Sequence, residues 1–370
     1  MAGNIDVATY LKYLKLAALD PMVYSEVANM PTTDEYDLVF AQNYRVINSE
    51  TLKRAFFTKT IPLVTYRAKG GKPEPIGKDA LDMEEITPLD LKLETIIEAN
   101  EIKNFMLQHS LRDRSLSRLE GVYKDKVDTF QFTKRKMIVN QCNELLGTGK
   151  ITMQYKDQDG LIHDAYQIDY TAIDGAINSA LTYADSSLHT WSSASTTASE
   201  ILHDIEAMRQ LGYDNSSGTL FKKGNDFVLF VGTTAMNYII ASYDPQANDF
   251  VLTRRGVNYY LNLHGKEVPI VKSTMKREYH QVNLTTGKYA ETSESKLAAN
   301  EIMLVDNTRG NFGVADLKYL NLSNVNTGIA VPFEVKFATD KYDEQVEMMF
   351  VSRPIAHGRT KAIIKGTVAA

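Results

Sequence analysis

The sequence lacks the residues and runs that mark several classes of protein. Among its 370 residues there is one cysteine, Cys142, so no disulfide can form within the chain. No stretch approaches the roughly 18 apolar residues typical of a membrane-spanning helix. The first ten residues contain Asp6 and neither a basic segment nor an apolar run, so we expect no secretory signal. These absences favour a protein made in a reducing compartment and without a membrane partner.

The sequence also lacks an excess of positive charge. The formal net charge is −5 at pH 7, whereas proteins that mainly bind nucleic acid usually carry a basic surplus. With 44% hydrophobic and 24% charged residues, the composition is that of an ordinary globular protein. The length favours two or three domains.

Catalytic and metal-binding motifs are missing as well. Residues 147–150, Gly-Thr-Gly-Lys, resemble the end of a phosphate-binding loop. However, Glu144 stands where the first glycine is required, and Ile151 where Ser or Thr would hold magnesium. The seven histidines form no helical i, i+4 pair, and cysteine pairs are absent, so the sequence predicts no zinc site. We therefore predict no catalytic, cofactor-binding or metal-binding residues, and we interpret the chain as a non-enzyme.

An exposed hairpin is predicted in the first third of the chain. Residues 56–66 have the composition of a strand, and Pro62 assigns them to an exposed edge because proline cannot donate to a sheet ladder. The paired glycines Gly70 and Gly71 are typical of a hairpin tip. The return limb, residues 76–87, is polar and acidic. Such a hairpin cannot stabilise itself in water, so we expect it to lie on another surface.

The remainder of the sequence predicts a mixture of helices and strands. Residues 1–50 are expected to form an arm with little core of its own. A helix is predicted to open at residues 87–90, and the helical pattern holds from about 102 to 146, with Cys142 as a small core residue. The other expected elements are a hairpin of strands 150–156 and 165–170, a helix from Thr197 or Ser199 that Gly212 ends, a buried strand 227–231, a helix through Ile240, and strands at 268–271, 302–305, 333–337 and 346–350.

Opposite charges gather in two neighbouring segments. Residues 74–101 hold nine acidic and two basic residues, a net charge of −7, and residues 103–136 hold nine basic and four acidic residues, a net charge of +5. Segments of opposite charge favour pairing, within a subunit or between subunits. Two solvated faces that do not contact each other fit the same pattern.

The order of these elements resembles the capsid fold of tailed bacteriophages of the Hong Kong 97 type, and more closely the family of phage lambda's major head protein. Several local motifs carry this resemblance. They are Arg67-Ala68-Lys69-Gly70-Gly71 at the loop tip, residues 74–77 and 85–88 in its proline-bearing return limb, residues 146–153 after the long helix, residues 227–238 and 302–313, and residues 343–355 with Arg353-Pro354-Ile355 at their end. The resemblance covers most of residues 50–370, and residues 243–295 match it poorly.

The resemblance implies an α+β fold with a long spine helix. The implied parts are an N-terminal arm (1–55), an extended loop (56–92), a peripheral domain (93–194 and 332–370) and an axial domain (195–331). It implies a major capsid protein that self-assembles through hexamers and pentamers into the icosahedral shell around the DNA of a tailed phage. Assembly is expected in the host cytoplasm, and the product is the virion.

The resemblance also implies partners and contact residues. The partners are the chain itself, a scaffolding protein, a portal protein, a decoration protein where the shell is of the decorated type, and the packaged double-stranded DNA, bound non-specifically. The predicted subunit-interface residues are those of the loop tip and the two charged segments: Arg67, Lys69, Gly70, Gly71, Lys72, Glu84, Glu85, Arg112, Arg114 and Arg118.

Two other interpretations stay open from the sequence. One is a different structural protein, such as a tail or surface-layer subunit, and the other is an enzyme of an unrecognised α+β class. The size of the purified protein distinguishes them, because an enzyme is expected to form a small, discrete oligomer and a capsid subunit to form capsomers or shells.

Overall fold

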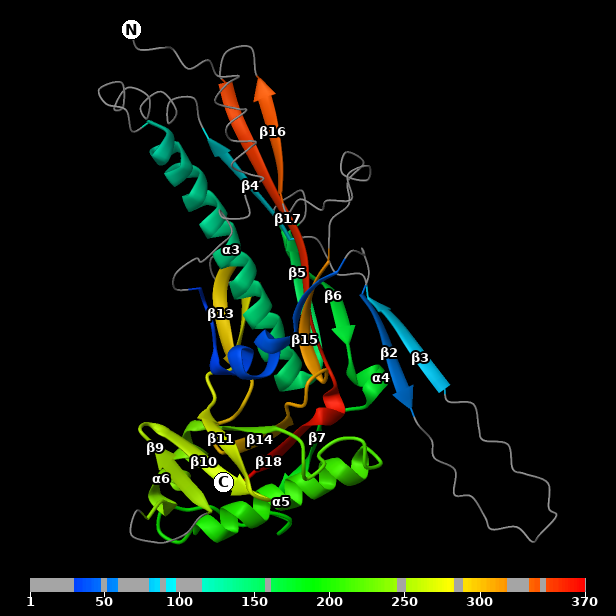
Figure 1. The fold of residues 1–370 in the computed structure, drawn as a ribbon, viewed down its shortest axis with the longest axis vertical. Coiled ribbons are helices and arrows are strands. Elements are labelled where there is room, and N and C mark those ends of the chain that lie inside the picture. The colour runs from blue at the N-terminus through cyan, green and yellow to red at the C-terminus, as the bar shows by residue number, and fades with distance from the viewer. Residues whose placement is uncertain are drawn as a thin grey trace, which may run out of the picture.

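The structure, a computed structural model, describes residues 30–47, 52–58, 80–86, 91–97, 115–156, 161–244, 251–282, 289–317, 333–339 and 344–369. Within these residues the molecule is elongated. A mixed sheet with two helices lies at one end, and a long helix leads away from it beside a second sheet (Figure 1). The mixture of helices and strands confirms the predicted α+β class.

A seven-stranded sheet forms the lower end of the molecule in Figure 1 and has the order β7-β18-β14-β8-β11-β10-β9. Its middle strand β8 (Phe227–Val231) is buried at every position, as predicted for a strand covered on both faces. β8 pairs in parallel with β11 (Lys266–Lys272) and antiparallel with β14 (Glu301–Asp306). The other strands are β7 (Asn178–Thr182), β18 (Ile363–Thr367), β10 (Asn258–Leu263) and β9 (Leu252–Arg255).

Two helices, α5 (Ala198–Asn215) and α6 (Thr233–Ser242), accompany this sheet. Of the two predicted starts of α5, Thr197 and Ser199, the first is confirmed, because Thr197 caps the helix in a reciprocal pair of hydrogen bonds with Glu200. The predicted end at Gly212 is wrong, since the helix continues to Asn215. A Cβ atom at Gly212 would lie 2.3 Å from a ring carbon of Phe221, so the glycine permits close packing and does not end the helix.

The long helix α3 (Ser115–Thr148) runs beside a second, five-stranded sheet. Ile138, Cys142 and Leu145 form its predicted core face and are at most 2% exposed. Gly149, at φ +73°, ends the helix as predicted. The strands of the sheet are β1 (Tyr44–Ile47), β15 (Phe312–Leu317), β17 (Glu344–Gly358), β16 (Phe333–Thr339) and β4 (Leu91–Ile97).

The prediction of a helix opening at residues 87–90 is wrong for the residues that follow. Residues 91–97 are the strand β4, which pairs antiparallel with β17 and sets Leu93 opposite Phe350 and Ile97 opposite Val346. The alternation of apolar residues in β4 suits a strand with one covered face. Long-range pairing therefore overrides the local helix-start signal.

Three hairpins complete the fold. β2 (Leu52–Thr58) and β3 (Ala80–Ile86) are the paired limbs of the predicted exposed hairpin. β5 (Lys150–Lys156) and β6 (Ile162–Asp169) form the hairpin predicted after the long helix, and the one-turn helix α4 (Thr171–Asp174) follows. β12 (Lys276–Val282) and β13 (Tyr289–Ser295) form a hairpin that the sequence did not predict. It lies in the segment that matches the family resemblance poorly.

The N-terminal segment from residue 36 packs onto its own subunit, which differs from the expected arm with little core. The π-helix η2 (Tyr36–Phe40) and the 3-10 helix η3 (Ala41–Asn43) precede β1, and Tyr36, Val39 and Phe40 are buried. The Phe40 ring meets Phe312 edge to face at 5.5 Å between centroids. The three apolar residues fall on one helical turn, which explains why the segment docks. Residues 1–29 lie outside the described residues.

The two sheets exchange strands and share one contiguous core. β7 and β18, which lie outside the expected axial range 195–331, complete the seven-stranded sheet, and β15, which lies inside that range, belongs to the other sheet. The boundaries at 195 and 331 stay predictions, and the exchanged strands join the two parts. Among the described residues, no helix is long and apolar enough to cross a membrane.

Candidate assembly surfaces

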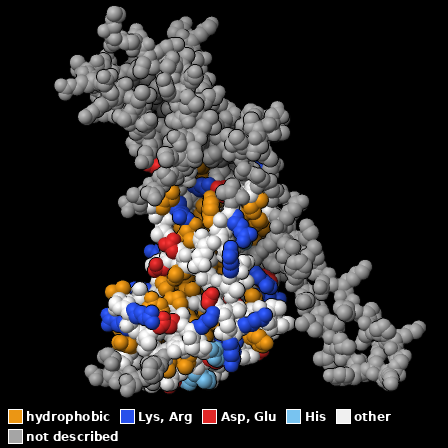
Figure 2. Space-filling view, viewed as in Figure 1, with side chains coloured by type: hydrophobic (Ala, Val, Ile, Leu, Met, Phe, Trp, Pro, Cys, Tyr) orange, Lys and Arg blue, Asp and Glu red, His pale blue; other side chains and the backbone are white. Residues whose placement is uncertain are grey.

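The described surface carries charges of both signs. Figure 2 shows Lys and Arg side chains scattered over this part of one face, with Asp and Glu side chains among them. Contact surfaces are therefore better sought in the shape of the elements than in a single charged patch.

The β2–β3 hairpin is anchored at its base and stands apart from the two sheets (Figure 1). Leu52 and Ile86 lie opposite each other in register and are 6% and 2% exposed. This buried pair fixes the place where the hairpin leaves the core. The predicted tip residues, residues 67 and 69–72, lie outside the described residues, so these five predictions stay predictions.

The acidic limb of the hairpin is placed by its backbone register. Glu84 lies opposite Arg54, and Glu85 lies opposite Lys53. Directly opposed residues are the closest neighbours across an antiparallel pair. The acidic limb therefore has two candidate partners. One is the basic strand of its own hairpin, and the other is the basic segment of the long helix.

The predicted basic partners are not placed by the structure. Arg112 and Arg114 lie outside the described residues, and Arg118 is placed only as a backbone position of α3. The pairing of the two charged segments therefore stays a prediction.

Asp316 of β15 joins four segments of the subunit. Its carboxylate accepts hydrogen bonds from the Tyr44 hydroxyl at 2.8 Å and from the Ser352 hydroxyl at 3.0 Å, and it forms an ion pair with Lys134 of α3. Burial, followed by the neighbouring charge of Asp316, raises the pKa of Tyr44 above its ordinary value. The phenol therefore stays protonated and donates, and the bonds tie β1, α3 and β17 to β15.

Side-chain amides hold the outer edge of β12. Asn140 of α3 donates to the carbonyl of Glu278 at 2.8 Å and accepts from its N–H at 2.7 Å. Gln154 of β5 makes the same reciprocal pair with His280, at 3.0 and 2.8 Å. The amides take the place of a neighbouring strand, so the hairpin is fixed to both α3 and β5. The sequence does not reveal this amide clamp, because each amide and its backbone partner lie more than 100 residues apart in the chain.

A cavity of about 200 Å³ lies between α3, β5 and β12. Glu144 and Arg277 line it, with Arg277 Nε 3.3 Å from Glu144 Oε1, while Glu144 Oε2 accepts from the N–H of Thr152 at 3.0 Å. Burial raises the pKa of Glu144, although the Thr152 hydrogen bond and the Arg277 charge oppose the shift. Glu144 and Arg277 form an ion pair with each other, so the pair joins α3 to β12.

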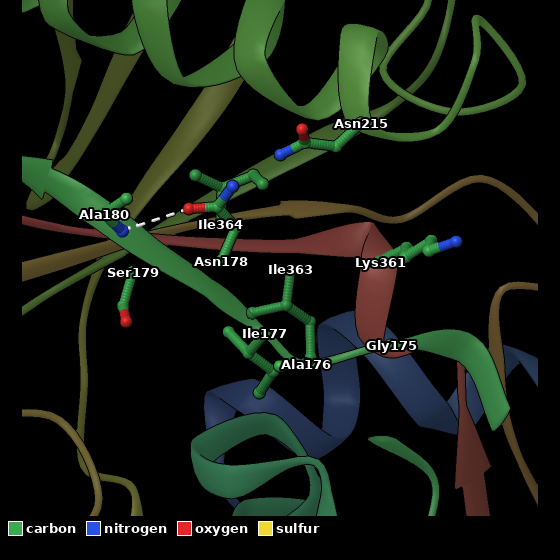
Figure 3. A pocket seen from close by; sticks show the side chains of 10 residues that line it. All are labelled: Gly175, Ala176, Ile177, Asn178, Ser179, Ala180, Asn215, Lys361, Ile363 and Ile364. Carbon is green, nitrogen blue, oxygen red and sulfur yellow. Dashed lines mark hydrogen bonds between the residues drawn. The ribbon is translucent and has the colours of Figure 1, made fainter. Parts of the chain in front are cut away.

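A larger cavity, of about 530 Å³, lies beside β7, the edge strand of the seven-stranded sheet (Figure 3). Ten residues line this cavity, and of these only Lys361 has an ionisable side chain. Asn178 turns back and accepts a hydrogen bond from the N–H of Ala180 at 3.0 Å. This lining offers neither an acid–base pair nor a nucleophile with a base.

The chain is similar to capsid proteins by its family model and by its fold. A family model described as phage major capsid protein E matches residues 37–368. A prophage protein of E. coli CFT073 that is described as a capsid protein has a similar crystal structure, with a TM-score of 0.50 and 12% identity over 99% of each chain. The capsid subunit of cyanophage A-1(L) gives a TM-score of 0.47 and 10% identity over 95% of this chain and 98% of that one. No curated protein sequence matches the chain.

Proposed function

The chain belongs to the phage major capsid protein E family, and from this membership we propose how its segments build a shell. It is a shell-forming head protein of a phage and thus a component of the virion, with a mixed α+β fold of the Hong Kong 97 type. The predicted family, fold and function are confirmed at this level. The arrangement of segments, the contact residues and the partners below are proposals.

The proposed organisation is an arm (1–55), an extended loop (56–92), a peripheral domain (93–194 and 332–370) and an axial domain (195–331). Two sheets in one subunit support the division into two main domains. The β2–β3 hairpin supports the loop, because a buried base and a projecting pair of strands suit contact with a neighbour. The proposed interface residues are those of the loop tip and the charged segments: Arg67, Lys69, Gly70, Gly71, Lys72, Glu84, Glu85, Arg112, Arg114 and Arg118.

The proposed assembly is an icosahedral shell of hexamers and pentamers around double-stranded DNA, formed in the host cytoplasm. The proposed partners are a scaffolding protein, a portal protein, a decoration protein and the packaged DNA, which a shell would contact without sequence preference. The proposed role is purely structural, without catalysis. Co-expression with and without the neighbouring phage genes tests the scaffolding proposal. Uniform shells from this chain alone would count against a scaffolding protein.

The observation that carries the function is the extent of the family match. Residues 37–368 include every described helix and strand except the first residue of η2, so the match covers both sheets and the β2–β3 hairpin. Light scattering on the purified chain is the direct test. We expect capsomers or shells, whereas a small oligomer of fixed size would favour an enzyme, and open tubes or flat arrays would favour a tail or surface-layer subunit.

A further inference from the structure

The loop before α5 places His189 beside His203 and Asp204, two adjacent residues of α5. The Nδ1 atom of His189 lies 2.6 Å from Oδ1 of Asp204, and the Nδ1 atom of His203 lies 3.8 Å from the same oxygen. One ligand atom from each residue falls within 4.8 Å of the others. The two imidazole rings meet edge to face with centroids 5.1 Å apart.

The carboxylate of Asp204 is buried and oriented by its neighbours. Asp204 is 0% exposed, and Oδ2 accepts a hydrogen bond from Trp191 Nε1 at 2.7 Å. The backbone N–H of His189 lies 3.1 Å from both carboxylate oxygens. These donors direct Oδ1 toward the imidazoles, and hydrogen bonds of this kind orient the ligands in metal sites. Burial also favours a cation beside the carboxylate, because an unpaired buried charge is costly.

The two imidazoles lie on the solvent side of the carboxylate. The side chains of His189 and His203 are 42% and 71% exposed. Figure 2 shows histidine side chains exposed at the lower end of the molecule, where α5 lies in Figure 1. An ion can therefore reach the site, and both rings can turn without displacing core residues.

We propose that His189, His203 and Asp204 bind a divalent transition-metal ion of the zinc, nickel or copper class through two imidazole nitrogens and one carboxylate oxygen. The ion takes the place of the hydrogen bond between His189 Nδ1 and Asp204 Oδ1, whose proton is released to solvent, and a water molecule completes the coordination. Ligands lie about 3.3 Å apart in a tetrahedral site with bonds of about 2.0–2.1 Å. The observed separations of 2.6 and 3.8 Å bracket that distance, so small rotations of the exposed rings suffice. Imidazole nitrogen selects such ions over magnesium and calcium.

The test is zinc binding by the untagged full chain after treatment with EDTA, followed by calorimetry and by thermal melting. We expect the wild type to bind one Zn²⁺ per chain, to melt at a higher temperature with zinc, and to ignore Mg²⁺. His203→Ala should weaken zinc binding by about tenfold or more and abolish the shift in melting temperature. His203 is exposed, so this variant should melt like the wild type without zinc. Binding should also weaken as the pH falls, because protons compete for the imidazoles.

His280→Ala is the matched control, since His280 is exposed and only its backbone is used by the amide clamp. Its zinc binding should equal that of the wild type. The proposal is overturned if the wild type binds no zinc, or if His203→Ala and His280→Ala bind it equally well. A shell that assembles normally in either case leaves the proposed function intact, so the two ideas fail separately.

Discussion

At Gly212 of α5 the helix backbone lies against the ring of Phe221, which is itself stacked on Phe227 with 5.9 Å between centroids. All three residues are buried. A single methyl group added at residue 212 would therefore clash with the Phe221 ring.

Gly212→Ala should destabilise the subunit although alanine is the better helix former. Overpacking a buried site costs about 1–3 kcal/mol, and alanine returns at most about 1 kcal/mol of helix propensity. We expect a net loss of about 1 kcal/mol, measured by urea unfolding of the unassembled subunit. Gly224→Ala is the control, because a Cβ there meets nothing within 4 Å. A variant at residue 212 that is as stable as this control would contradict the packing role.

Glu144→Gln should reveal the pH dependence that the buried carboxyl imposes. The folded-state pKa of Glu144 is raised above its ordinary value of 4.5. A raised pKa means that the folded state holds the proton more tightly than the unfolded state. Its contribution to stability is therefore complete below pH 4.5 and is lost as the pH rises through the raised value. The wild type should lose stability relative to Glu144→Gln across that window, as measured by urea unfolding at several pH values.

Glu294→Gln provides a control of opposite sign. A hydrogen bond from Lys296 at 2.8 Å lowers the pKa of Glu294. Its contribution is present above pH 4.5 and is lost as the pH falls through the lowered value, so this comparison should slope the other way. Equal slopes for the two variants would contradict the burial argument for Glu144.

At the scale of elements, the β12–β13 hairpin depends on the amide clamp. Asn140→Ala should expose the Glu278 N–H, and Gln154→Ala should expose the His280 N–H, each with a loss of about 0.5–1.5 kcal/mol. Amide hydrogen exchange resolves the two sites, and each variant should accelerate exchange at its own partner. Asn140→Asp is the matched control of the same shape, which keeps the acceptor and loses the donor to the Glu278 carbonyl. Unchanged exchange at both partners would show that the hairpin is held by other contacts.

The acidic limb of β3 has two competing partners, which charge reversal separates. Glu84→Lys with Glu85→Lys should impair assembly at low salt, because exposed pairs are weak, about 0–1 kcal/mol each, but recur throughout a shell. If the limb meets a neighbour's helix, adding Arg112→Glu and Arg114→Glu should restore assembly. If it pairs within its hairpin, Lys53→Glu and Arg54→Glu should restore it instead. We predict the first result, and rescue only by the second pair would contradict the contact between subunits.

Local signals predicted the elements that local contacts determine. The capping box at Thr197, the apolar run of β8 and the glycine stop at residue 149 each act within a few residues. β4 was mispredicted because its partner in β17 is far away in the chain, and pairing decided its conformation. Gly212 was misread because a glycine can end a helix or admit a ring, and the ring belongs to another segment.

The candidate contacts also fall into those that a local motif indicates and those that only the folded chain brings together. The resemblance of the loop-tip motif pointed to the family, which the family match confirms. The amide clamp and the histidine pair were invisible in the sequence, because Asn140 lies 138 residues from Glu278 and His189 lies 15 residues from Asp204. Spacing rules for helices and strands do not reach that far.

At the scale of the whole molecule, the subunit combines one shared core with a hairpin whose base is buried in that core. The exchanged strands join the two sheets. At the base of the hairpin, Leu52 of β2 and Ile86 of β3 are buried in the shared core. We propose that the loop between β2 and β3 contacts a neighbouring copy, which would couple this contact to assembly by mass action.

Electron microscopy of particles made by the full chain and by a chain lacking residues 69–77, each co-expressed with the neighbouring phage genes, tests this account most directly. We predict closed shells from the full chain. The shortened chain should stay soluble, melt at the same temperature as the unassembled wild type and build no shells, because we propose that the loop makes contacts only between subunits. Shells from the shortened chain equal to those of the wild type, or a shortened chain that no longer folds, would contradict the account.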